Sequence, residues 1–160
     1  MRPLGGVILL AAAALGGPVT AQGVASTSVQ IVAEPASVRF DPDQPPTALN
    51  FGNVPIGSDY TIDAGTGAEP NSGEAARFSV LGPPFQAYSI SLPSAPVFLV
   101  NAATGVAGPV QLTEFETNVG SPQVSFLGAD TFYVGARVFV DSTAGSGFWS
   151  GTYTVTIANQ

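Results

Sequence analysis

Cysteine, histidine and lysine are absent from this sequence of 160 residues, and charged residues make up only 9% of it. Without cysteine the chain forms neither a disulfide nor a thiolate nucleophile, and the usual structural zinc sites lose their ligands. Without histidine no Ser-His-Asp triad can be built, and general acid–base catalysis would fall to Asp, Glu or Tyr. We therefore expect a protein that is not an enzyme and that uses no cofactor or metal ion.

Positive charge is also scarce. Four arginines (Arg2, Arg39, Arg77 and Arg137) stand against eleven acidic residues, which gives a net charge of −7. The arginines form no cluster that could follow a phosphate backbone, so nucleic acid is not an expected partner. Hydrophobic residues, at 45%, are too frequent for an intrinsically disordered chain. The length suits one folded domain.

The first 21 residues have the pattern of a secretory signal peptide. Arg2 supplies the basic start, residues 7–15 are apolar, and Val19-Thr-Ala21 is a small-residue cleavage site. The apolar run is shorter than the roughly 20 residues that a stable membrane anchor needs. We expect cleavage before Gln22, no stable membrane span in the mature chain, and a location that is secreted, periplasmic or at the cell surface.

Turn-forming residues are plentiful: fourteen prolines and nineteen glycines are spread along the chain. This composition favours short strands over long helices. About nine short apolar runs, one of them at residues 124–126, recur at intervals of roughly ten residues, as in sandwiches and barrels. We expect an all-β, immunoglobulin-like sandwich formed as a single domain by residues 22–160.

The last third of the chain has the clearest strand pattern. In residues 149–157 every second residue, from Trp149 to Ile157, falls on one face, as in a half-buried strand. Residues 131–140 alternate in the same way, and a glycine-rich turn joins the two runs. The pattern predicts a closing β-hairpin over residues 131–157. The predicted core includes Phe51, Phe78, Val80, Val138, Tyr153 and Val155.

Two acidic pairs are candidates for chemical sites. Asp41 and Asp43 offer oxygen ligands for calcium, but no spaced ligand series follows them, so solvated turn residues are the favoured interpretation. Glu114 and Glu116 are the nearest approach to a glycosidase pair. They are two residues apart on a predicted strand and share one face, with Phe115 turned to the core, which favours a solvent-exposed face.

Two aromatic residues form the one candidate for ligand stacking. Phe148 and Trp149 follow the glycine-rich turn and could stack on a sugar ring. Trp149 is in phase with Tyr153 and Val155, so the pattern favours a core position for the indole ring. Ligand stacking at this pair remains the alternative.

The start of the mature chain is extended and poor in charge. Residues 22–33 contain Val24, Val29 and Ile31 among Ser and Thr residues, with few charges to protect a strand edge. Such a segment could add to the sheet of another chain. It could equally form the first strand of its own domain, and spacing does not separate the two arrangements.

Several motifs together resemble a family of small secreted bacterial β-proteins, DUF4402. They are LNFG at 49–52, ARFSV at 76–80, YSISLP at 88–93, FYVGA at 132–136 and GFWSGTYTVTI at 147–157. The chain departs from the family in ending Ala158-Asn-Gln160, without a terminal aromatic residue, and in placing Trp149 where tyrosine is more usual. The family has no assigned catalytic residues.

A more distant similarity is to spore coat U-like proteins and chaperone–usher pilus subunits. Those proteins use an N-terminal extension as a donor strand for a neighbour, and many carry a disulfide, which this chain lacks. The resemblance implies an exported structural or surface subunit, fimbria-like, that joins like subunits or other surface proteins by strand exchange. The alternative is a secreted or periplasmic domain that binds a glycan or small ligand.

Overall fold

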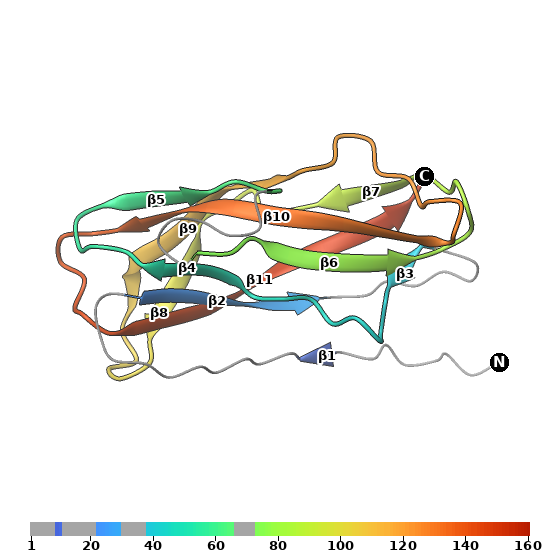
Figure 1. Cartoon of the computed structure of the whole chain (residues 1–160). Helices are drawn as coiled ribbons and strands as arrows, with labels where there is room; N and C mark the ends of the chain where they lie inside the picture. Colours follow the sequence, from blue (N-terminus) through green and yellow to red (C-terminus); the bar gives the residue numbers. More distant parts are fainter. Residues whose placement is uncertain (1–8, 11–21, 30–37, 66–72) are drawn as a thin grey trace.

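A computed structural model describes residues 9–10, 22–29, 38–65 and 73–160, and these residues form strands, turns and loops without a helix (Figure 1). An all-β structure is thus confirmed for the described part of the chain, which contains no helix that could span a membrane. The strands are β1 Leu9–Leu10, β2 Gln22–Val29, β3 Arg39–Phe40, β4 Leu49–Asn53, β5 Asp59–Ile62, β6 Ala76–Leu81, β7 Tyr88–Ser91, β8 Val97–Asn101, β9 Ala107–Thr117, β10 Ala129–Val140 and β11 Phe148–Asn159.

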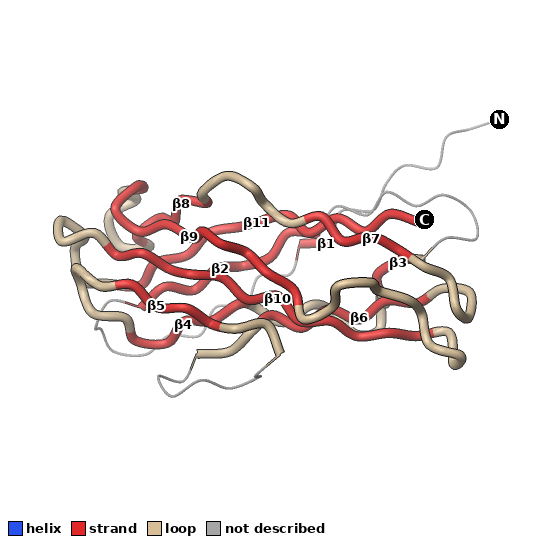
Figure 2. Tube along the Cα trace, turned by 90° about the horizontal axis from the view of Figure 1, so that it is seen from above, coloured by secondary structure: helices blue, strands red, loops and turns tan. Residues whose placement is uncertain are grey.

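The strands form one strongly curled sheet that wraps around a single core (Figures 1 and 2). Its main path runs β1-β2-β11-β8-β9-β10-β6-β3, with β4 on β2, β5 on β10 and β7 on β11. Among the described strands, pairing is antiparallel except between β2 and β11, which run parallel. Two backbone hydrogen bonds between Asn50 and Glu74, of 2.9 and 2.6 Å, link β4 to the residues just before β6.

The core follows from the alternation of apolar residues. Tyr153, Val155 and Ile157 of β11 are buried, and the intervening Thr154 is exposed. From the other side of the core, Phe78 and Phe132 stack with ring centroids 5.1 Å apart, and Phe40 packs against Phe78. The prediction of the core is confirmed, because its members are all buried: Phe51, Phe78, Val80, Val138, Tyr153 and Val155.

The predicted closing hairpin is wrong. β10 and β11 are both present, but β10 pairs with β5, β6 and β9, whereas β11 pairs with β2, β7 and β8. The apolar faces of the two strands are both buried, and the connection at 141–147 is much longer than a two-residue hairpin turn. The strands therefore contribute to opposite walls of the core instead of pairing edge to edge.

The predicted strand at residues 124–126 is also corrected. Val124 is buried and its backbone exchanges hydrogen bonds with Phe85 and Gln86, but the chain then turns through Gly128, with φ of 81°. Phe126 lies in this turn and is 69% exposed. The apolar run resembles a strand in sequence, yet only its first residue faces the core.

Candidate functional site

The first candidate site is the place that strand β2 occupies in the sheet. Residues of β2 from Gln22 to Val29 align in parallel with β11 from Phe148 to Val155. On its other side β2 pairs antiparallel with β4, where Ala25 is opposite Leu49. The segment is therefore an internal strand, and its removal would leave the backbone edges of both β11 and β4 unpaired.

The structure places two of the three predicted strand-exchange residues in this strand. Val24 aligns with Ser150 and Val29 with Val155 of the same chain, whereas Ile31 lies outside the described residues. The predicted signal peptide also lies outside the description, except for Leu9–Leu10, which pair with Val29 and Ser28 as strand β1. Cleavage before Gln22 would remove β1 and leave β2 at the start of the mature chain.

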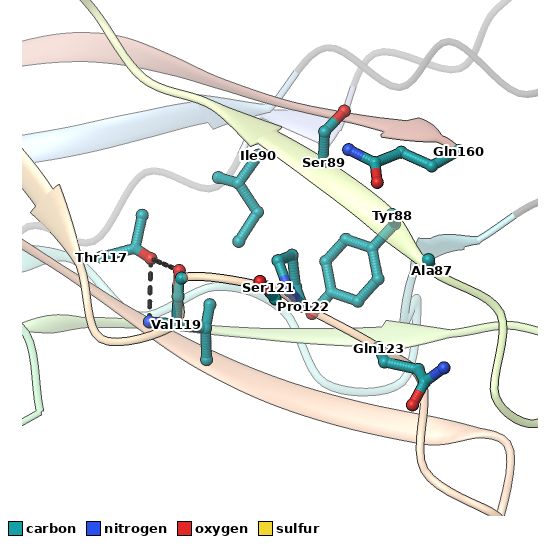
Figure 3. A pocket seen from close by; sticks show the side chains of 11 residues that line it. Ala87, Tyr88, Ser89, Ile90, Thr117, Val119, Ser121, Pro122, Gln123 and Gln160 are labelled. Atoms are coloured by element: carbon teal, nitrogen blue, oxygen red, sulfur yellow. Dashed lines mark hydrogen bonds between the residues drawn. The ribbon is translucent and has the colours of Figure 1, made fainter.

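The second candidate site is a pocket of about 440 Å³ between β7 and the segment that joins β9 to β10 (Figure 3). Ile90 of β7 points toward Val119 and Thr117, and the ring of Tyr88 lies beside Pro122. The hydroxyl of Thr117 accepts a hydrogen bond from the Val119 amide and donates one to its carbonyl, which fixes the turn at the end of β9. The pocket is therefore bordered by one strand edge and one braced turn.

No side chain that lines this pocket is a carboxylate or a cation. The lining consists of Ala87, Tyr88, Ser89, Ile90, Thr117, Val119, Gly120, Ser121, Pro122, Gln123 and Gln160. Tyr88 is fully buried, and its hydroxyl donates to Asp130 over 2.8 Å. Burial, and next the hydrogen bond and negative charge of Asp130, raise the pKa of Tyr88. Tyr88 thus stays protonated at neutral pH, and the site suits uncharged ligands with hydroxyl or amide groups.

The edge of β7 also faces the pocket. The amide of Tyr88 donates to the Pro122 carbonyl, while the neighbouring carbonyl of Ala87 accepts from the Gln160 amide, each over 3.2 Å. Successive residues of a strand direct their backbone groups to opposite sides. Ile90, two residues after Tyr88, therefore directs its amide and carbonyl away from β11 and toward the pocket. The pocket thus offers backbone as well as side-chain hydrogen-bonding groups.

The predicted stacking pair lies elsewhere. Trp149 is only 2% exposed, and its indole nitrogen donates to the Gly145 carbonyl over 3.1 Å. The core position that the alternation favoured is therefore the one observed. Phe148 is half-buried at the start of β11. Neither face of the indole ring is available for a sugar while this packing holds.

Asp41 and Asp43 lie in a turn that local hydrogen bonds stabilise. Asp41 is 7% exposed and accepts hydrogen bonds from the Asp43 amide and from the side chain of Gln44. No group of three or more metal-ligating side chains occurs in the described part of the chain.

Glu114 and Glu116 also have separate partners. Glu114 stands at a β-bulge with φ of 52° and forms an ion pair with Arg137, while Glu116 accepts from the Ala64 amide. Arg137 also forms an ion pair with Asp59. The sequence placed Glu114 and Glu116 on one strand face but did not indicate the bulge, because the bulge depends on how β9 pairs with β10.

Among the residues whose burial the structure describes, the most exposed large apolar side chains lie in two neighbouring turns at the end of the molecule that holds the C-terminus. Phe85, Phe126 and Leu127 are 64%, 69% and 77% exposed. Phe85 has φ of 62°, an uncommon conformation for a bulky residue, and its amide donates to the Val124 carbonyl. We name this group of three residues the tip. Sequence reasoning assigned Phe126 to a strand and gave no role to Phe85 or Leu127.

Most of this chain matches a known protein family. Residues 44–159 match the family described as Domain of unknown function (DUF4402). The chain belongs to this family, which confirms the resemblance drawn from its motifs. No curated protein matches the sequence. The matching segment begins after β2 and β3, so the strand that lies between β11 and β4 is outside the matched residues.

Proposed function

We propose that this protein is an exported, non-enzymatic structural or surface subunit, fimbria-like, that associates with like subunits by exchanging strand β2. The observation that supports this proposal most directly is the position of β2. It is an internal strand between β11 and β4, and it precedes the segment that matches the family. A strand from a neighbour in the same place would form the same backbone hydrogen bonds. Exchange of an identical element is therefore a low-cost route to association.

The proposed fold is an immunoglobulin-like sandwich in which the exchanged strand β2 lies inside the sheet, between β11 and β4. Its support is the division of partners between β10 and β11, which line opposite walls of one core. The proposed location is the periplasm, the cell surface or the medium, supported by the signal-peptide pattern of residues 1–21. The absence of cysteine, histidine and lysine supports the proposal that the subunit is not an enzyme.

A disulfide trap tests the exchange directly, because the chain has no cysteine of its own. Ser26 and Thr152 are Cα partners across β2 and β11, within the separation that a disulfide spans. Ser26→Cys combined with Thr152→Cys is expected to give disulfide-linked dimers after oxidation. Ser26→Cys with Thr131→Cys, on a strand that does not pair with β2, is the matched control. Disulfides confined to single chains at every protein concentration would overturn the proposal.

The second candidate function is binding of a neutral glycan or small ligand in the pocket beside β7. Its support is the volume of about 440 Å³, within the range of ligand sites, and a lining of hydroxyl, amide and apolar groups without a charged side chain. Ser121 lies on the lining and is exposed. Ser121→Trp is expected to abolish NMR shift changes caused by neutral oligosaccharides. Ser94→Trp, at an exposed serine between β7 and β8 that is not part of this lining, is the control and should retain them. Unchanged spectra of the wild-type protein would exclude this function.

A further inference from the structure

The tip residues Phe85, Phe126 and Leu127 lie at the end of the molecule where an exchanged strand would leave its acceptor. β2 runs parallel to β11, and its last residue, Val29, aligns with Val155, four residues before the end of β11 at Asn159. The chain re-enters the described structure at Val38, whose amide donates to the Asn159 side chain over 2.8 Å. Both the exit from β2 and the entry to β3 therefore lie toward the C-terminal end of β11 (Figure 1).

The length of the intervening chain limits how two copies can be joined. Residues 30–37 connect Val29 to Val38, and even fully extended they span only about 30 Å. β11 has 12 residues and is about 40 Å long. A neighbour attached at the opposite end would require the connection to run back about 23 Å along β2 before leaving the acceptor. A neighbour at the tip end needs only about 13 Å to reach the end of β11.

The geometry points to a reciprocal, tip-to-tip dimer, in which each copy places β2 in the other and the tip of one chain packs against the tip of its partner. This inference rests on the proposed strand exchange and specifies its partner, a second copy, and its symmetry. Donor and acceptor both present their tip ends, so further copies would meet at the same end. Exchange through this connection therefore joins the copies in closed pairs, and a fimbria-like assembly would be built from such pairs through a further contact.

The chemistry of the tip fits such a contact. Residues 82–86 and 125–129, which carry Phe85, Phe126 and Leu127, contain no charged side chain. The Gly82 amide donates to the Gly128 carbonyl between the two segments, and the side chain of Gln123, which precedes the second segment, donates to the Phe85 carbonyl. The backbone of the two turns is thus braced before contact. Three side chains form less than the roughly 800 Å² per partner of a standard interface, so the exchanged strands would supply the rest.

Single-cysteine variants locate the contact. Pro84 is exposed beside the tip, and Ser146 is exposed in the loop at the opposite end. With a short bifunctional thiol reagent, Pro84→Cys is expected to cross-link to itself as a dimer, and Ser146→Cys is expected to stay uncross-linked. Cross-links between the two variants in a mixture would indicate head-to-tail contact and overturn the inference.

A triple serine variant tests whether the tip contributes to affinity. Phe85→Ser, Phe126→Ser and Leu127→Ser together are expected to weaken dimerisation at least about tenfold in sedimentation experiments. Phe98→Ser, which changes an exposed aromatic residue on β8, is the matched control and should leave the dimer unchanged.

An exchanged dimer with an unaltered dissociation constant in the triple variant would overturn the inference while the proposed function stands. A wild-type protein that remains monomeric would overturn the proposed function itself. A monomer that binds phosphatidylcholine vesicles through the tip would assign this surface to lipid and also overturn the inference.

Discussion

The hydroxyl of Tyr88 donates a hydrogen bond of 2.8 Å to a carboxylate oxygen of Asp130 and so connects two strands that are not neighbours in the sheet. Tyr88 begins β7, which pairs with β11, and Asp130 lies at the start of β10, which pairs with β6. The ring of Tyr88 also contacts Phe132, with centroids 6.5 Å apart. One polar contact and one aromatic contact therefore hold the two walls of the core together beside the pocket.

The first prediction concerns Tyr88→Phe. At neutral pH this variant is expected to lose about 1–2 kcal/mol of unfolding free energy, because a hydrogen bond to a charged group is removed. Burial and Asp130 raise the pKa of Tyr88 above that of the unfolded chain, so its contribution is fully present below about pH 10 and declines as the pH rises further. Urea unfolding between pH 7 and 11 should show the difference between wild type and variant shrinking above pH 10. Parallel curves would contradict this linkage.

The second prediction concerns Gly135, where the backbone of β10 meets the end of β5. A Cβ atom at this position would lie 2.1 Å from the Ile62 carbonyl oxygen and 2.6 Å from the Ala64 nitrogen. Backbone atoms cannot move aside as a flexible side chain can, so Gly135→Ala should destabilise the protein by about 3 kcal/mol or more. Thermal unfolding is the measurement. Gly145→Ala, with no atom within 4 Å, is the control and should leave the melting temperature nearly unchanged.

The third prediction concerns the core of β11. Tyr153 is 2% exposed and its ring packs against Phe115 with centroids 5.1 Å apart. Tyr153→Ala should therefore cost about 3 kcal/mol or more, as large aromatic truncations in cores do. Thr154→Ala changes the next residue on the exposed face and serves as the control. An unchanged denaturation midpoint for Tyr153→Ala would show that this side chain does not contribute to the core.

The fourth prediction concerns export. The exported protein is expected to begin at Gln22, because Val19-Thr-Ala21 provides the small residues that signal peptidase requires. N-terminal sequencing of the protein recovered outside the cytoplasm tests this directly. Ala21→Arg should block processing, whereas Thr20→Ser should not. Recovery of wild-type protein that still begins at Met1 would contradict the predicted cleavage.

The sequence by itself determined that the chain is built from short strands and which residues of several of those strands face the core. The alternation around Tyr153 and Val155 predicts their burial, because successive side chains of a strand point to opposite faces. The same alternation favours a core position for Trp149. The motifs also determined the family, because each motif consists of a few neighbouring residues that can be recognised without knowing the tertiary structure.

Only the tertiary structure decided which strands are neighbours. β10 and β11 are adjacent in sequence yet line opposite walls, because pairing depends on long-range packing and not on the alternation within either strand. The parallel alignment of β2 with β11, the bulge at Glu114, and the hydrogen bond from the Phe85 amide to the Val124 carbonyl likewise join residues far apart in sequence. The pocket beside Ile90 exists because β7 remains with β11 while β9 ends against β10, a divergence that no local pattern encodes.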